Sequence, residues 1–529
     1  MKKKLMKKKL MKKIIFGALA ISLLAAGCKK WVDDVYLNPN NPTVVDPETV
    51  LPPVTANVAR GVQFDARMTG AFVGYWCRVT SFDSWDRHGY IAGNDAGGEK
   101  WRTHYWNLGQ NLVNAIRDSR TDRPEIAGVS YAFFAYSWLH LADYHGPVIL
   151  KQAFDATRLT FDYDEQQEAY EYVLQICDSA IQYLDRGIAG GGASRLAQAD
   201  RFLYSGDLQK WKRFVYGVKA KTFQRWWNKP NYSADSVIKY VNLSFTSIQD
   251  DANIKFENNA NFPDRLNFFG PRRANLGVFR AGKWYMDMLS GVYTNGIIDP
   301  RRAYIFTPSL DGQFRGTVPS LGETVSTQQT RTANLWGFKP TSAAANNNAP
   351  ALDDTCRTFF KNASFAPILT YTELQFLKAE AAFKKRDMAT ALQSYRAGIQ
   401  ASFDQLSTHF TGYTRFTTAQ RDAYLNNPSI VPTAADALTL QQIMMQKYIA
   451  LWGHGWEETY TDMRRHNWDT VNIYKGFSLP NFFPDNNGKF ANRVRPRYNS
   501  EYLWNAEALR KVGGFDPDYH TKPVWFQQN

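Results

Sequence analysis

Apolar residues recur at intervals of three and four positions along most of the chain, a spacing that predicts amphipathic helices. The clearest example is residues 101–119, where Trp101, Tyr105, Leu108, Leu112 and Ala115 share one face. We therefore assign Trp101 and Tyr105 to the core. The other long single helices are predicted at residues 54–79, 126–144, 164–184, 207–227 and 436–452.

A pair of shorter helices is predicted at residues 370–403. Thr370 and Glu373 fit a capping box, in which the hydroxyl and the carboxylate bind free backbone N–H groups at the start of the helix. Asp387 can cap the second helix of the pair. The apolar face of that second helix consists of Met388, Ala391, Leu392, Tyr395 and Ile399. Two helices joined by a tight turn indicate an irregular TPR-like hairpin, since the strict repeat of roughly 34 residues is missing.

Polar segments separate the helical regions. Residues 28–53 are rich in Pro, Asn and Asp, and we interpret them as an extended tether. Residues 309–353 form a long polar insertion, and a loop of that length inside a domain is usually functional or disordered. The mainly helical body is predicted to be one large unit over residues 54–529, with TPR-like hairpins supporting an irregular, loop-rich half.

The first 27 residues have the order of a secretory signal. Eight lysines fall within the first 13 residues, and Ile14 to Gly27 carry no charge. This run of 14 residues is shorter than the roughly 20 needed to span a bilayer. Met11 already begins a complete signal, although Met1 and Met6 are alternative starts.

Small residues precede Cys28, and this segment resembles a bacterial lipobox. It departs from the commonest pattern in that Leu24 stands one place earlier. We expect residues 1–27 to be removed and Cys28 to carry acyl chains such as palmitate, which hold a protein on a membrane surface. The alternative is an ordinary secretory signal that happens to end near a cysteine.

The charge of the chain depends strongly on this first segment. Its removal lowers the formal net charge from +14 to +6, and no cluster of Lys and Arg remains beyond short pairs. The sequence therefore gives no support for nucleic-acid binding. Cys77, Cys177 and Cys356 lack the spacing of a metal site, and we interpret them as buried thiols with at most one disulfide among them.

No catalytic motif is present in the sequence. We find no GxSxG, HExxH, Walker loop or GxGxxG after a strand. Asp83 and Asp86 flank Trp85, but such neighbouring acids are typical of turns and caps, and the histidines form no metal-ligand pair. We expect a protein that is not an enzyme and has no metal or cofactor.

Aromatic residues make up 15% of the chain, and those in polar loops are candidates for ligand contact. Sugar rings stack on flat aromatic side chains, and their hydroxyls need amide, carboxylate or guanidinium partners, which the loop at 81–94 supplies. The candidate ligand-binding residues are Trp85, Asp86, Arg87, Tyr90, Asn94, Phe314 and Trp336. The alternative for Trp85 is packing under its own loop. The tryptophans in helical segments are assigned to the core: Trp211, Trp284, Trp452 and Trp456.

Several segments occur in an order that spans nearly the whole chain after the signal. They are the signal ending at Cys28, HLADYHGPVIL (140–150), YDEQQEAYEYVLQICDSAIQYL (163–184), DRFLYSGDLQKWKRF (200–214), DPRR (299–302), YTELQFLKAEAAFKK (371–385) and QKYIALWGHGWEETYTDMRRHNW (446–468). Together they resemble the SusD/RagB family of nutrient-binding outer-membrane lipoproteins. HLADYHGPVIL departs from the usual pattern, in which an acidic residue often precedes Tyr-Gly and a second proline follows.

The resemblance implies a mostly helical unit with four TPR-like helix pairs supporting an irregular binding half. It also implies a lipid-anchored protein on the outer face of the outer membrane, acting as a lid on a SusC-like TonB-dependent transporter. Such proteins capture glycans, or in some cases peptides, and no catalytic residue is carried over. The loop aromatics favour a glycan. The other hypotheses are a peptide-binding member of the family, a TPR-type adapter that binds only proteins, and a helical glycosidase.

Overall fold

The structure is a computed structural model that describes residues 45–529, apart from 96, 260, 263–264, 324–326, 338–346 and 351–355, and a few positions between 4 and 13. The chain divides into residues 1–46 and a compact body, Pro47–Asn529. Cys28, most of the predicted signal and the first part of the predicted tether lie outside the described residues.

The body begins with helix α2 (Pro47–Phe72), so the predicted tether of 28–53 is wrong over its last seven residues. Pro52 and Pro53 lie inside this helix and cannot donate backbone hydrogen bonds. Leu51, Val54 and Val58 are buried against the rest of the body. Their burial offsets the helix-breaking tendency of the two prolines, which the sequence pattern alone does not reveal.

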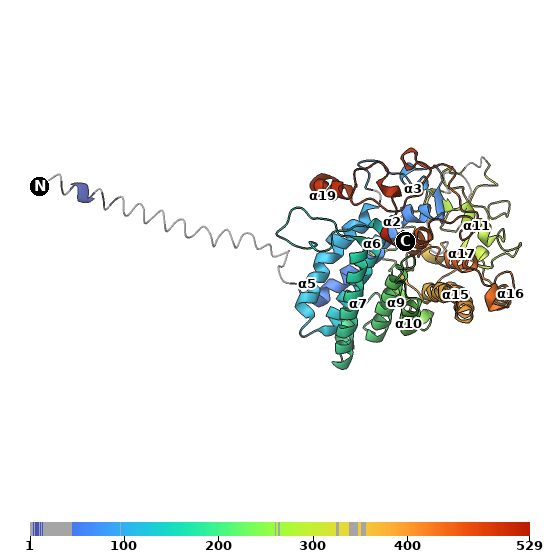
Figure 1. The fold of residues 1–529 in the computed structure, drawn as a ribbon, viewed down its shortest axis with the longest axis horizontal. Helices are drawn as coiled ribbons and strands as arrows, with labels where there is room; N and C mark the ends of the chain where they lie inside the picture. Colours follow the sequence, from blue (N-terminus) through green and yellow to red (C-terminus); the bar gives the residue numbers. More distant parts are fainter. Residues whose placement is uncertain are drawn as a thin grey trace. The chain divides into compact units, whose positions relative to one another are not determined.

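Three pairs of consecutive helices pack against each other, and Figure 1 shows the first two pairs side by side. They are α6 (Pro124–His145) with α7 (Gln166–Ala189), α9 (Leu208–Gln224) with α10 (Ala234–Leu243), and α14 (Tyr371–Lys385) with α15 (Met388–His409). Helices α17 (Leu440–Ala450) and α18 (Trp456–Arg465) follow. The predicted mainly helical fold is confirmed.

The remaining elements are short. The helices are α3 (Asp83–Asp86), α4 (Gly98–Arg102), α5 (Gln110–Ser119), α8 (Ala193–Ala199), α11 (Lys283–Leu289), α12 (Arg301–Ile305), α16 (Thr418–Leu425) and α19 (Ala506–Lys511). Two π-helices are η1 (Thr103–Gly109) and η8 (Tyr498–Tyr502). The 3-10 helices are η2 (Ile248–Asp250), η5 (Thr358–Phe360), η6 (Ala435–Ala437), η7 (Pro484–Asn486), η9 (Tyr519–Thr521) and η10 (Trp525–Gln527). Strand β1 (Trp76–Arg78) pairs antiparallel with β3 (Phe279–Ala281), and β2 (Ala252–Lys255) with β4 (Phe365–Leu369).

The start of α14 confirms one half of the predicted capping box. The Thr370 hydroxyl accepts a hydrogen bond from the backbone N–H of Glu373 at 3.1 Å. The Glu373 carboxylate does not return to Thr370, because it turns into the body and lies 2.7 Å from the Lys221 ammonium. Asp387 caps α15 as predicted, by accepting from the Thr390 N–H.

A network of buried charges connects the helix pairs. Arg225, which directly follows α9, contacts Asp143 of α6 and Glu458 of α18, each at 2.7 Å. The neighbouring members of the network are Lys221, Glu373, Glu380, Lys447, Asp462 and Arg465. Buried charges are stable only when paired, so this network makes the relative placement of five helices interdependent.

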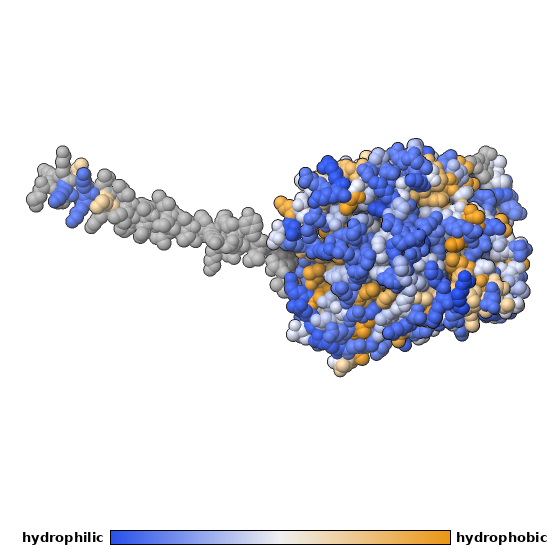
Figure 2. Space-filling model, in the orientation of Figure 1, coloured by the Kyte–Doolittle hydropathy of each residue, from blue (hydrophilic) through white to orange (hydrophobic). Residues whose placement is uncertain are grey.

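The core is strongly aromatic. Trp211, Trp284, Trp452 and Trp456 are buried as predicted. Cys77, Cys177 and Cys356 are buried thiols. On the face shown in Figure 2, hydrophilic residues cover most of the surface, with apolar residues in small groups between them. Across the described residues, every helix is too short or too polar to cross a membrane.

Candidate functional site

Two exposed tryptophans lie beside neighbouring cavities of the body. Among the tryptophans in the described part of the chain, only Trp106 and Trp504 are exposed, each with 77% of its surface accessible. Trp106 lines a cavity of about 810 Å³, which we call the aromatic cleft. The other residues that line it are Trp101, Arg102, Tyr105, Ile149, Ala153, Phe154, Phe161, Arg497, Ser500 and Glu501. Trp504 lines a side pocket of about 370 Å³, and the two cavities share Phe161.

The π-helix η1 presents the aromatic side chains of one wall. The sequence predicts one continuous helix over 101–119, but α4, η1 and α5 replace it. Trp101 is buried and forms part of the floor, whereas Tyr105 is only half-buried and Trp106 projects into solvent. π-helical turns within α-helices are frequent at functional sites.

The candidates from the sequence do not include Trp106, although its position on the predicted helix sets it apart from the other aromatic residues. With 3.6 residues per turn, Trp106 lies roughly 140° around a helix from Trp101. That position is on the polar face, where a tryptophan has no packing role. An aromatic residue off the apolar stripe was therefore a better indicator of an exposed ring than aromatics in loops.

The floor of the cleft is held in place by specific contacts. The Tyr105 hydroxyl donates to the Ile149 carbonyl at 2.8 Å and accepts from the Ile149 N–H at 2.9 Å. Phe154 has a φ of 65°, a left-handed conformation that costs about 1–3 kcal/mol for a bulky residue. Its ring packs so closely on Gly109 that a Cβ there would lie 2.2 Å from it. Such strain persists only where the surroundings impose it, which marks the floor as a constrained surface.

The opposite wall comes from η8 and the residues after it. Glu501 is buried, and its carboxylate accepts hydrogen bonds from Trp101 Nε1 at 3.2 Å, the Tyr163 hydroxyl at 2.8 Å and Asn505 Nδ2 at 2.9 Å. The Asn505 side chain also donates a hydrogen bond to the Phe161 carbonyl and accepts one from the Phe161 backbone N–H. Burial beside Glu501 raises the pKa of Tyr163, so its hydroxyl stays a neutral donor. Glu501 therefore joins the two walls through these hydrogen bonds.

Two guanidinium groups lie at the rim. Arg102 is about half-exposed and 3.7 Å from Glu99. Arg497 contacts Asp95 at 3.1 Å, and the other oxygen of Asp95 accepts from the Tyr498 N–H at 2.7 Å. The rim thus offers hydrogen-bond donors whose charges are already balanced by carboxylates.

Two of the sequence candidates lie in the loop that packs against this wall. The Tyr90 ring stacks on Tyr502, with centroids 6.1 Å apart, and the Arg495 guanidinium lies 4.0 Å from the centre of the Tyr90 ring. Asn94 is half-buried and directly precedes Asp95, the partner of Arg497. These residues support the wall of the aromatic cleft without lining it.

Trp85 and Arg87 are held by other parts of the body. Trp85 is half-buried, stacked on Phe279 with centroids 5.8 Å apart and flanked by the guanidinium of Arg67. This packing under its own loop is the alternative that the sequence left open. Arg87 pairs with Asp83 at 2.7 Å and donates to the Phe482 carbonyl.

Asp86 and Trp336, which the sequence also offers as ligand contacts, are buried in the structure. Asp86 is 2% exposed, and its two oxygens accept from the N–H groups of Arg78 and Phe82. Burial raises its pKa above the ordinary value, although these bonds oppose the rise. Trp336 is fully buried and donates to the Phe269 carbonyl at 2.9 Å. Both residues stabilise the body.

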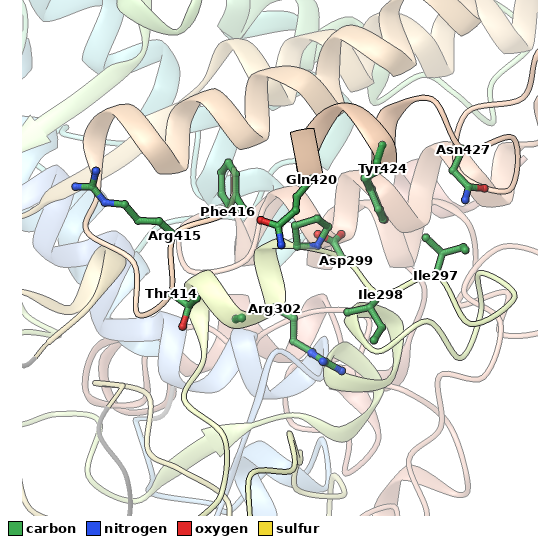
Figure 3. A pocket seen from close by; sticks show the side chains of 13 residues that line it. Ile297, Ile298, Asp299, Arg302, Thr414, Arg415, Phe416, Gln420, Tyr424 and Asn427 are labelled. Atoms are coloured by element: carbon green, nitrogen blue, oxygen red, sulfur yellow. The ribbon is translucent and has the colours of Figure 1, made fainter. Parts of the chain in front are cut away.

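A third cavity, of about 400 Å³, lies between α12 and α16 (Figure 3). Phe416, Gln420 and Tyr424 lie on one side of it and Arg302 on the other. Arg302 donates to the Ser290 hydroxyl and stacks on Phe314, the remaining sequence candidate, which is half-buried.

The carboxylate of this third cavity, Asp299, is fully engaged by Arg301. Its lining contains no tryptophan, and we therefore place the candidate site in the aromatic cleft.

The chemistry of the aromatic cleft is that of binding. Flat rings supply stacking surfaces and the arginines supply donors. The described residues contain no group of three or more His, Cys, Asp or Glu placed to hold a metal ion.

Comparisons with known proteins agree with this architecture. A SusD-like family model, described as starch-binding and associating with the outer membrane, matches residues 39–481. The match ends before Arg497, Ser500 and Glu501, which line one wall of the cleft. A comparison with curated proteins finds no match.

Solved structures share the fold over nearly the whole chain. A SusD/RagB family protein from Bacteroides thetaiotaomicron is 24% identical, with a TM-score of 0.64, and the match covers 92% of this chain and 99% of that one. A chitin-binding SusD homologue from Flavobacterium johnsoniae is 21% identical, with a TM-score of 0.69, covering 91% of this chain and 99% of that one. At these identities the likeness shows the fold.

Proposed function

The chain belongs to the SusD/RagB family, and from this premise we propose that it captures an oligomeric nutrient, with a glycan favoured, in the aromatic cleft. The observation that carries the proposal is the exposure of Trp106 at the edge of a large cavity with a constrained aromatic floor. Exposing a tryptophan ring has no packing benefit, so its position at the cavity edge supports contact with a ligand.

Capture requires no covalent step. The C–H face of a sugar ring would stack on Trp106, and its oxygens would accept from Arg102 and Arg497. The volume of about 810 Å³ lies within the range of roughly 300–1,000 Å³ typical of small-molecule sites. Many weak contacts give moderate affinity, which allows release to the next protein.

The family description supports a glycan, since it names starch. Two solved relatives of the same fold are described as chitin-binding. A peptide ligand is the alternative within the family, and it would use the same arginines through its carbonyl groups.

Delivery is part of the proposal. We propose that acyl chains on Cys28 hold the body at the outer face of the outer membrane. From there it would pass its ligand to a SusC-like TonB-dependent transporter. The association of the family with the outer membrane supports this arrangement.

The test is titration calorimetry of the soluble body with oligosaccharides and peptides. We expect a glycan to bind, and Trp106→Ala to weaken its binding at least tenfold with an unchanged far-UV spectrum. Phe262→Ala removes an exposed aromatic side chain elsewhere and serves as the control. Equal affinities for the wild type and Trp106→Ala would contradict this site. Cleavage of the glycan would contradict a pure binding function.

A further inference from the structure

We infer that the aromatic cleft selects sugars that carry an N-acyl group, such as N-acetylhexosamines, over sugars that carry only hydroxyls. This inference rests on the proposed function, because it names the class of glycan that the same cleft would take. Three properties of the lining lead to it: an apolar floor, polar groups that are mainly donors, and balanced rim charges.

The floor is more apolar than a hydroxylated sugar requires. Ile149, Ala153, Phe154 and Phe161 line it around the indole of Trp101. A hydroxyl buried against such a surface without a partner loses about 1–3 kcal/mol on the evidence of protein mutants. A hexose carries hydroxyls around its whole edge, whereas an acetamido group ends in a methyl. The methyl can fill the floor beside the small Ala153 and remove apolar surface from water.

The polar groups of the lining lack a free carboxylate. Glu501 is the one carboxylate among the lining residues, and its oxygens accept from Trp101, Tyr163 and Asn505. Sugar hydroxyls commonly donate to such carboxylates, which this cleft does not offer. Arg102 and Arg497 instead offer N–H groups, and the carbonyl oxygen of an acetamide is a strong acceptor for them.

The rim charges favour a neutral acceptor. Arg102 lies 3.7 Å from Glu99, and Arg497 lies 3.1 Å from Asp95. Because a carboxylate lies beside each guanidinium, the rim attracts an anionic sugar only weakly. A deacetylated amino sugar lacks the acetamide carbonyl and methyl, and its ammonium group would lose hydration against the apolar floor.

Matched oligosaccharides give a direct test. Chitohexaose, cellohexaose and a fully deacetylated chitosan hexamer share one backbone and differ only in the group at carbon 2. Titration calorimetry of the soluble wild-type body should show chitohexaose binding at least tenfold more tightly than cellohexaose, with the chitosan hexamer weakest. Maltohexaose and an oligouronate of the same length complete the panel.

Two variants connect this preference to the cleft. Ala153→Leu fills the floor where the methyl would lie, and it should reduce the preference for chitohexaose over cellohexaose to less than threefold. Arg497→Met should weaken chitohexaose more than cellohexaose, and it keeps the test valid if Ala153→Leu fails to fold. Arg186→Met, on an exposed part of α7, is the matched control and should change neither affinity.

The outcomes separate the two proposals. Equal binding of chitohexaose and cellohexaose, or binding of maltohexaose alone, overturns the N-acyl inference and leaves glycan capture intact. Tightest binding of the oligouronate overturns it in favour of an anionic ligand. If no member of the panel binds, the inference fails, and glycan capture is then judged by the broader titration with Trp106→Ala.

Discussion

Asp65 illustrates how burial changes the chemistry of a single residue. It lies in α2, is 2% exposed, and accepts a hydrogen bond from the backbone N–H of Lys100 at 2.8 Å. Burial raises the pKa of this carboxyl from 3.8 to about 7, against the lowering effect of the bond from Lys100. Because Lys100 lies next to Trp101 in the cleft floor, the protonation of Asp65 acts close to the candidate site.

The first prediction concerns the pH dependence of stability at Asp65. The unfolded chain loses this proton near pH 3.8 and the folded chain near about 7, so folding stability falls as the pH rises between these values and is level above them. Asp65→Asn cannot ionise, and we expect it to be more stable than the wild type at pH 8 with little difference at pH 4. Urea unfolding at several pH values measures this, and a constant difference across the range would contradict it.

At the scale of elements, the π-helix η1 and the turn that follows α6 depend on each other. Gly109 ends η1, and the Phe154 ring occupies the space of its missing side chain. A helix of regular α geometry was predicted here because the apolar spacing of 101–119 fits it. The spacing identified the buried side correctly, but the extra residue of the π-turn is imposed by packing against α6 and Phe154.

The second prediction follows from this contact. Gly109→Ala places a Cβ 2.2 Å from the Phe154 ring, so the ring must move and the cleft floor with it. We expect a loss of stability of about 1–3 kcal/mol and at least tenfold weaker glycan binding. Gln110→Ala, at the exposed neighbouring position, is the control. Unchanged binding by Gly109→Ala would show that the floor does not contact the ligand.

The third prediction concerns the helices joined by buried charges. Arg225 is fully buried and bonds both oxygens of Asp143 and of Glu458. Arg225→Met leaves both carboxylates short of partners, and we expect it to lower the free energy of unfolding by about 3–5 kcal/mol. Lys385→Met breaks an exposed pair with Asp235 and should cost at most about 1 kcal/mol. Similar losses in the two variants, measured by urea unfolding, would show that the buried network contributes no more than a surface pair.

At the scale of the whole molecule, segments far apart in the sequence meet at the aromatic cleft. The cleft combines α4, η1, the turn at 149–154 and residues 497–501, which are distant in the sequence. The family match reaches to residue 481, and the wall formed by Arg497, Ser500 and Glu501 follows it.

The fourth prediction concerns the lipid anchor. Cys28→Ala should abolish the incorporation of labelled palmitate and release the protein from the membrane fraction into the soluble one. Cys177→Ala, which alters a buried thiol of the body, should leave both unchanged. Continued acylation of Cys28→Ala would rule out the lipobox at this cysteine.

The sequence by itself determined the local features of this protein. Helical periodicity located most long helices, and Thr370 and Asp387 marked two helix starts, because capping and amphipathic spacing depend on residues a few positions apart. Core tryptophans such as Trp211 were identified for the same reason.

Tertiary structure alone decided which aromatic side chains are exposed and which carboxylates form ion pairs or hydrogen bonds. Trp336 and Asp86 were expected at the surface and are buried, whereas Trp106 and Trp504 were passed over and are exposed. Glu373 was assigned to its own helix end and instead pairs with Lys221. Exposure and ion pairing depend on residues hundreds of positions away, such as Glu501 beside Trp101, and no local pattern contains that information.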